Sequence, residues 1–327
     1  MTITITLLIA GAALLTSTAA LRWSGRRLVD RLWPAVAVPV LAAGALINAG
    51  SLLVLCGLLA VAVLGRWAAV APLGGWSPDA LAVDVPEPVV VGLAAAAAVM
   101  VFGGRTVWFT GRLLFRLGHA DRCGRRLRGR GGPIVFVEDP AGDAYTMAGV
   151  RGCVVISRHL FDALDPSDRR VLLAHELSHL RRRHHLYVHA VDAAAAANPL
   201  LRPLGPAVRL GVERWADEDA AAAGDRAGAG RALARTALVQ AGLRRRAAIR
   251  PSDGPATRLG VATGDVPTRV HALLDRPSPR HHRVLLALVT LLVLTSLGTA
   301  TSMSRIHAGL EHAEIGHRTA HADHRSA

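Results

Sequence analysis

The sequence has few cysteines, and their placement excludes a disulfide-stapled fold. Only three occur among 327 residues: Cys56 lies within an apolar run, and Cys123 and Cys153 are well apart. Small extracellular domains usually carry an even set of cysteines that pair as a framework. We therefore expect the polar part of this chain to face a reducing compartment.

Lysine is absent, so all 38 basic residues are arginine, and they give the chain a net charge of +14. In a soluble protein such a surplus would suggest nucleic acid as the partner. However, the sequence has no nucleic-acid recognition motif, only 4% of it is aromatic, and the arginines cluster beside apolar runs. Arginine clusters of this kind orient membrane spans. We expect the lipid bilayer as a partner and no direct contact with nucleic acid.

The first apolar run, residues 3–21, has no basic residue before Arg22. This lack counts against a secretory signal peptide, which opens with a positive segment, although residues 16–20 would serve as a small-residue cleavage region. The run is long enough to cross a bilayer once. Basic residues follow it instead, at Arg22, Arg26, Arg27 and Arg31. The pattern predicts an uncleaved first span with the N-terminus outside the cell.

Three further apolar runs predict spans at 34–65, 88–110 and 284–303. Residues 34–65 exceed one crossing, but two crossings of about sixteen residues would be short for a bilayer core of roughly 30 Å. Counting one crossing places both arginine-rich loops inside and the loop 66–87 outside. We therefore expect a multi-pass plasma-membrane protein with three transmembrane helices in 1–110 and a fourth at 284–303.

Residues 304–327 would then lie outside the cell, as a tail that contains five histidines. A metal-capturing tail is one interpretation of this composition. The histidine spacing repeats no ligand pattern, so we expect a disordered polar tail.

One short motif carries chemistry: His175, Glu176 and His179 form HExxH. On a helix, residues four apart share a face, so both imidazoles can bind one metal ion. Glu213 would be the third ligand, and Asp217, one turn later, would orient a ligating histidine. Two histidines, one carboxylate and an open position are typical of catalytic zinc, with Glu176 as general base. The alternative is a surface helix with two solvated histidines.

Two assignments near this motif stay open. Glu218 is also close in sequence to the predicted ligand Glu213, but the ExxxD spacing favours Glu213 because Asp217 then falls on the same helical face. The run at residues 181–185, three arginines followed by two histidines, could supply ligands. At the end of a helix near a membrane, it is expected to be a solvated basic end instead.

The polar residues 111–283 predict a cytoplasmic, mainly helical α+β domain that carries this site. Branched residues indicate short strands at 133–137 and 152–157, with another near 143–146. A strand beside the metal helix would let an extended peptide pair with its backbone, and the alternative is that the strands only cover the core. The helices are expected at 159–164, 169–181, 188–197, 207–223, 231–250 and from 269, with a Gly/Pro-rich loop at 251–267.

The Ala-rich helix 188–197 has two alternative placements. It could enter the membrane or pack on the metal helix. Since only about ten of its residues are apolar, too few to span a bilayer, we expect it to pack on the metal helix.

Four segments of the chain carry a family resemblance: 171–179, 198–199, 213–217 and 269–270. Together with the four-span layout, they resemble the BlaR/MecR-type membrane zinc metallopeptidases. These are related in design to the HtpX-like and CAAX-prenyl proteases, which share HExxH plus ExxxD. The resemblance implies a zincin domain with the minigluzincin fold and one zinc ion (Zn2+) per chain, and it carries zinc ligation to His175, His179 and Glu213, with Glu176 as base.

The β-lactam sensors of this family carry a penicillin-binding domain after the last span. Only residues 304–327 follow the last span here, so β-lactam sensing is not expected. The resemblance then implies regulated proteolysis of a cytoplasmic protein substrate, often a DNA-binding repressor.

The expected reaction is hydrolysis of a peptide bond. The oxyanion that develops needs a donor besides zinc, and His271 and Tyr145 are candidates by position. Two other functions remain alternatives: an HtpX-like quality-control protease of membrane proteins, and a non-catalytic zinc-binding membrane signalling protein. In the latter the fourth coordination position would be closed.

Overall fold

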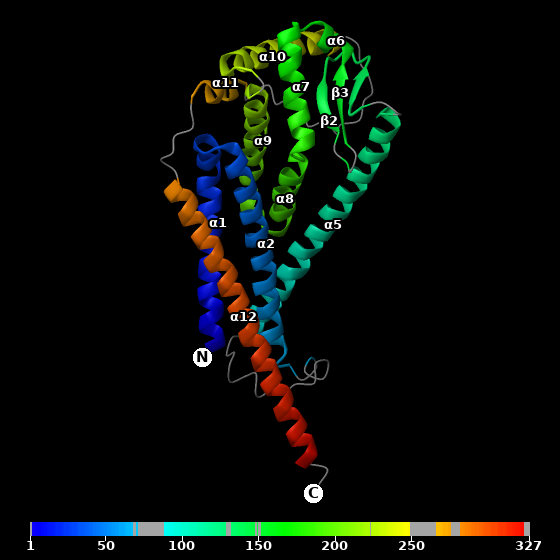
Figure 1. The fold of residues 1–327 in the computed structure, drawn as a ribbon. Helices are drawn as coiled ribbons and strands as arrows, with labels where there is room; N and C mark the ends of the chain where they lie inside the picture. The colour runs from blue at the N-terminus through cyan, green and yellow to red at the C-terminus, as the bar shows by residue number, and fades with distance from the viewer. Residues whose placement is uncertain are drawn as a thin grey trace.

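The computed structural model describes residues 2–67, 70, 88–128, 132–147, 149, 152–222, 224–248, 266–275 and 282–323. Four long helices form an elongated bundle, and shorter helices with a small sheet form a lobe at one end of it (Figure 1). The long helices are α1 (Thr2–Arg31), α2 (Pro34–Leu64), α5 (Val89–Arg128) and α12 (His282–Asp323). The predicted loops 66–87 and 251–267 lie largely outside the described residues.

All four long helices are long and apolar enough to cross a membrane. Three of them extend well past the predicted spans, and among them α5 continues to Arg128. Residues 111–128, expected to begin the cytoplasmic domain, are therefore the end of the long helix α5. No proline interrupts this stretch, and its arginines and leucines favour helix.

The tail after the last span also differs from the prediction. Helix α12 runs from His282 to Asp323, so the segment expected to be disordered is helical to Asp323. The stretch contains no proline, and alanine, leucine, glutamate and arginine within it are good helix formers.

The lobe is built from five helices and a sheet. The helices are α6 (Arg158–Asp162), α7 (Pro166–Arg181), α9 (Leu204–Ala221), α10 (Arg226–Ala248) and α11 (Val266–Leu274). The short helix η1 (Pro199–Leu201), directly before α9 in the chain, lies instead against α1. A core of aliphatic side chains joins the sheet to α6, α7 and α10, with Ile156 and Leu160 fully buried at its centre.

The sheet has three strands in the order β1-β3-β2. They are β1 (Ile134–Val137), β2 (Ala144–Met147) and β3 (Cys153–Ser157), close to the three predicted strands. Strand β3 is buried along its length, pairs parallel to β1 and pairs antiparallel to β2. Within the described residues, strand β2 is therefore at an edge of the sheet, and it packs against α7.

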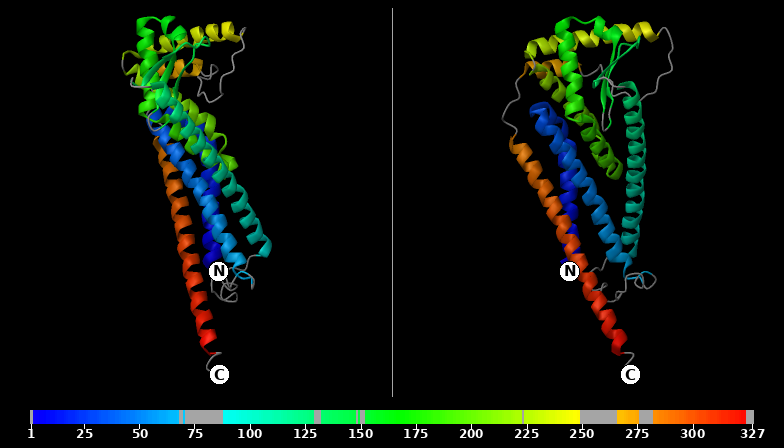
Figure 2. Two further views of the ribbon diagram at one scale, coloured as in Figure 1. Left: turned by 90° about the vertical axis from the view of Figure 1, so that its right-hand side faces the viewer. Right: turned by 45° about the vertical axis from the view of Figure 1, so that its right-hand side comes forward.

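Helix α8 (His184–Ala197) does not lie where the sequence predicted. It packs chiefly against α2 and α5 rather than on the metal helix α7, and its end reaches between them (Figure 2). Arg105 Nε of α5 donates to the Ala196 carbonyl at 3.2 Å, and Val188 and Val191 join a core shared with α1 and α2. The prediction was wrong because small alanine side chains allow close approach to the long helices, although the segment is too short to span a membrane.

A buried polar cluster joins α8 to the long helices. Asn48, on α2, is fully buried, and its Nδ2 donates to Ser17 Oγ at 2.8 Å and to Thr18 Oγ1 at 3.0 Å. Asn198, directly after α8, donates from Nδ2 to Asn48 Oδ1 at 2.9 Å. Polar groups buried among apolar helices are costly unless paired, so this cluster fixes how α1, α2 and α8 meet.

We expect Asn48→Leu to destabilise the protein by about 1–3 kcal/mol, because the buried amide of Asn198 loses its acceptor. The measurement is the midpoint of unfolding in detergent. Thr16→Val is the matched control, since Thr16 Oγ1 is exposed and donates within its own helix to Ala12 O at 2.7 Å. Equal midpoints for the two variants would contradict the role given to Asn48.

Candidate metal centre

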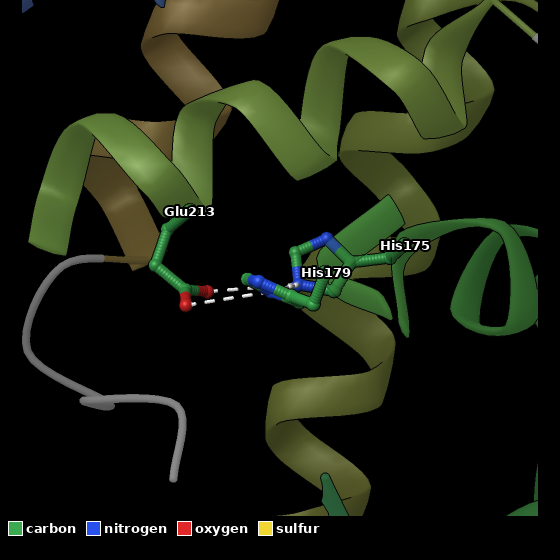
Figure 3. Close-up of side chains that lie close together, drawn as sticks. All are labelled: His175, His179 and Glu213. Atoms are coloured by element: carbon green, nitrogen blue, oxygen red, sulfur yellow. Dashed lines mark hydrogen bonds and ion pairs between the residues drawn. The ribbon is translucent and has the colours of Figure 1, made fainter. Parts of the chain in front are cut away.

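Helix α7 positions the HExxH histidines. Proline at its first position and Asp168 in its first turn suit a helix start. One turn apart on this helix, His175 and His179 point their Nε2 atoms at each other across 3.2 Å (Figure 3). The i, i+4 spacing thus brings both imidazoles to one point, as the sequence predicted.

Glu213 of α9 completes the cluster. Its Oε2 lies 3.6 Å from His175 Nε2, and its Oε1 lies 3.6 Å from His179 Nε2 (Figure 3). One ligand atom from each residue falls within 4.8 Å of the other two. The alternative ligand Glu218 is engaged elsewhere, since both its carboxylate oxygens accept from Arg226 at 2.7 Å.

The residues present fit a divalent cation. Two imidazole nitrogens and a carboxylate are the donor set of catalytic zinc sites. Glu213 Oε2 is buried and accepts no hydrogen bond, although Arg269 Nη1 lies 3.1 Å away. A buried carboxylate oxygen in that condition is suited to a metal ligand.

Asp217 lies behind His175, in the position predicted for an orienting carboxylate. Its Oδ1 is 3.0 Å from His175 Nδ1. Arg269 of α11 holds the same carboxylate through both oxygens, at 2.6 and 2.8 Å. Arg269 is only 1% exposed. Burial alone would lower its pKa, but Asp217 and Glu213 hold the pKa above its ordinary value.

Glu176, the predicted general base, is buried and held by a strand residue. Thr146 Oγ1 of β2 lies 2.9 Å from the Glu176 carbonyl oxygen and 3.0 Å from Glu176 Oε2, so its one proton is shared between these two acceptors. The sequence did not single out Thr146, and it gave Arg269 no role. Alternation along the predicted strand was a signal for Thr146, and the family resemblance at 269–270 was a signal for Arg269.

Neither predicted oxyanion donor is brought to the cluster in this way. Tyr145 precedes Thr146 on β2, and neighbouring residues of a strand point to opposite faces. His271 is exposed on α11, and Arg269 is the residue of that helix that reaches the site.

His184 corrects the prediction for the basic run. Arg181, Arg182 and Arg183 are exposed as expected, but His184 is buried. The reason is the left-handed backbone of Arg183, at φ 50°, which turns the chain sharply between α7 and α8. His184 Nδ1 then lies 3.0 Å from His179 Nδ1. Burial, and secondarily His179, lower the pKa of His184 to about 3, which keeps its ring neutral.

The charges of the cluster predict how metal binding depends on pH. Burial lowers the pKa of His175, but the carboxylates of Asp217 and Glu213 raise it overall, to about 10. Burial lowers the pKa of His179, and although burial would raise the pKa of Glu213, His175, His179 and Arg269 lower it. Near neutral pH a metal must therefore displace one proton, from His175.

We expect the metal affinity to rise about tenfold per unit between about pH 6 and 8, because one proton is released per metal bound. Competition with a chelator at each pH measures the slope. Asp217→Asn removes the charge that raises the His175 pKa, so its slope should be shallower. A wild-type affinity that is constant over this range would contradict the assignment of the proton to His175.

Comparison with known proteins adds one match. The sequence profile of Peptidase family M48 matches residues 121–202. This segment contains the three strands, α7 and α8, and it ends before Glu213 and Asp217. No curated protein and no solved structure matches the chain. The match supports a membrane-associated zinc metallopeptidase in general, and the BlaR/MecR type within that class stays a prediction.

Proposed function

We propose that this protein is a membrane-bound zinc endopeptidase that hydrolyses peptide bonds of a cytoplasmic protein in regulated proteolysis, with a transcriptional repressor as the substrate class. The observation that carries the proposal is the meeting of His175, His179 and Glu213 beside the buried carboxylate of Glu176. A structural zinc site would have a fourth protein ligand. Among the described residues, three side chains form the cluster, which favours a catalytic site.

The residues divide the work of hydrolysis. His175, His179 and Glu213 would hold the metal, which when bound would supply a Lewis acid for the scissile carbonyl and would lower the pKa of a bound water to about 7. Glu176 takes the proton of that water and passes it to the leaving amine. The bond from Thr146 Oγ1 fixes the Glu176 carboxylate for this transfer, and Asp217 fixes the ring of His175.

The edge of β2 supports a way for substrate to bind. Within the described part of the chain, β2 pairs with β3 on one side, and its Thr146 reaches Glu176. An extended peptide that paired with the other side of β2 would lie beside the reacting groups. Backbone pairing of this kind does not depend on sequence, so specificity would come from other contacts.

The arrangement of the long helices supports a cytoplasmic lobe. The ends of α1 and α5 and the start of α12 lie at the lobe side of the bundle (Figure 1). These ends carry arginines, among them Arg31, Arg128 and Arg283. Arginine-rich ends stay on the cytoplasmic side, so both termini of the chain would be outside the cell.

A comparison of newly formed protein N-termini tests the function in cells that carry wild-type protein or Glu176→Gln. We expect a small set of cytoplasmic cleavages to vanish with the substitution, with a DNA-binding repressor among the substrates. Identical sets under varied envelope stress would favour the non-catalytic signalling protein.

One observation favours quality control of membrane proteins as the second candidate. The ligand helix α9 packs on α1 and α2, and Arg214, next to Glu213, donates to the Val29 carbonyl of α1. The candidate site therefore stands directly against the long helices. If the cleavages that vanish fall within membrane proteins rather than in a repressor, this second function replaces the first.

A further inference from the structure

His184 is a buried histidine for which the hydrolytic mechanism above has no use. It is the first residue of α8, it is 1% exposed, and its ring packs on Trp215 with centroids 4.9 Å apart. Its Nδ1 lies 3.0 Å from Nδ1 of His179. Two imidazole nitrogens at this distance share one proton, so one ring donates and the other accepts.

The geometry of His179 decides which ring donates. Its Nε2 is the nitrogen that faces His175 Nε2 at 3.2 Å and Glu213 Oε1 at 3.6 Å. A neutral imidazole that gives Nε2 to a metal carries its proton on Nδ1. Nδ1 of His179 is then the donor, and Nδ1 of His184 is the acceptor within reach.

We propose that His184 is a positioning residue, which accepts the hydrogen bond from His179 and thereby holds that ring with Nε2 toward the metal. This inference rests on the proposed zinc site. The two ligating histidines are then held by different groups: His175 by the carboxylate of Asp217 and His179 by a neutral imidazole. Partners of this kind fix the tautomer and the orientation of a ligand.

A simple packing role for His184 makes a different prediction from an acceptor role. Asparagine and leucine have nearly the same shape, so His184→Asn and His184→Leu lose the same contacts with Trp215. Only asparagine offers an oxygen, Oδ1, close to the place of the imidazole Nδ1. The pair therefore separates hydrogen bonding from packing.

The experiment measures the zinc dissociation constant of the full-length protein in detergent, by competition with a chelator, for wild type and both variants. We expect His184→Leu to weaken zinc binding by about 10–100-fold, and His184→Asn to stay near wild type. The absorption spectrum of the cobalt-loaded protein should change with leucine and be kept with asparagine. His185→Leu, on the next residue of the same helix, serves as the control and should bind zinc as wild type does.

Equal weakening by asparagine and leucine would overturn the proposal, and so would wild-type affinity in the leucine variant. If the leucine variant does not fold, a folded asparagine variant weakened tenfold or more would also overturn it. Wild-type protein that fails to bind one zinc ion would refute the proposed function itself. The wild-type titration therefore distinguishes failure of the inference from failure of the site.

Discussion

Glu176→Gln is expected to bind zinc like the wild type and to lose about 10²- to 10⁴-fold of its turnover, the usual contribution of a general base. The substitution keeps the size of the side chain and its bond from Thr146 Oγ1, which lies 3.0 Å from Oε2. It removes only the ability to take a proton from water. The measurement is single-turnover cleavage of a substrate identified by the comparison of N-termini, together with the zinc content of the purified protein.

Glu218→Gln is the matched control for this loss. Glu218 is the glutamate near the site that pairs with Arg226 instead of the histidines. Its amide variant should turn over at nearly the wild-type rate. Full turnover by Glu176→Gln would remove Glu176 from the mechanism, and loss of zinc in that variant would show that it acts in binding.

Arg269→Met is expected to have the largest effect on stability, about 3–5 kcal/mol, because it removes the bidentate partner of the buried Asp217 carboxylate and leaves only His175 Nδ1, 3.0 Å from one oxygen. Asp217 is only 4% exposed, and both its oxygens accept from Arg269. The free energy of unfolding in detergent measures the effect. It should fall in metal-free protein as well, since the ion pair does not need the metal.

Two further variants make this prediction specific. Arg158→Met removes an arginine from an exposed pair, with Glu138 at 3.0 Å, so it should cost about 1 kcal/mol or less. Adding Asp217→Asn to Arg269→Met removes the stranded charge and should recover part of the lost stability. An Arg269→Met protein that unfolds at the wild-type midpoint would show that solvent reaches Asp217.

Local patterns predicted the parts of the site that depend on one helix. The spacing of His175 and His179 predicts that both lie on one face of a helix, and the ExxxD spacing predicts the same of Glu213 and Asp217. The structure brings these two faces together. The short strands were likewise predicted from the sequence, because they are rich in branched residues. Periodicity alone predicts which side chains share a face of a single helix or strand.

The remaining contacts come from segments far apart in the chain. Arg269 reaches Asp217 across 52 residues, and Thr146 reaches Glu176 across 30. The burial of His184 depends on a left-handed residue, Arg183, that no local rule anticipates, since arginine rarely adopts this conformation. The placement of α8 was missed for a related reason: a run of alanines fits equally well against a soluble helix or a transmembrane one.

The two ends of α8 lie in different surroundings. His184 begins the helix at the metal cluster, and Asn198, directly after it, is bonded to Asn48 in the middle of α2. Fourteen residues of helix span about 21 Å, and a helix of that length moves as one body. Separation of α2 from α8 would therefore displace the ring of His184, which contacts His179. Thermodynamic reciprocity then requires the converse. The zinc-binding free energy that comes from the correct orientation of His179 also favours the close packing of the long helices.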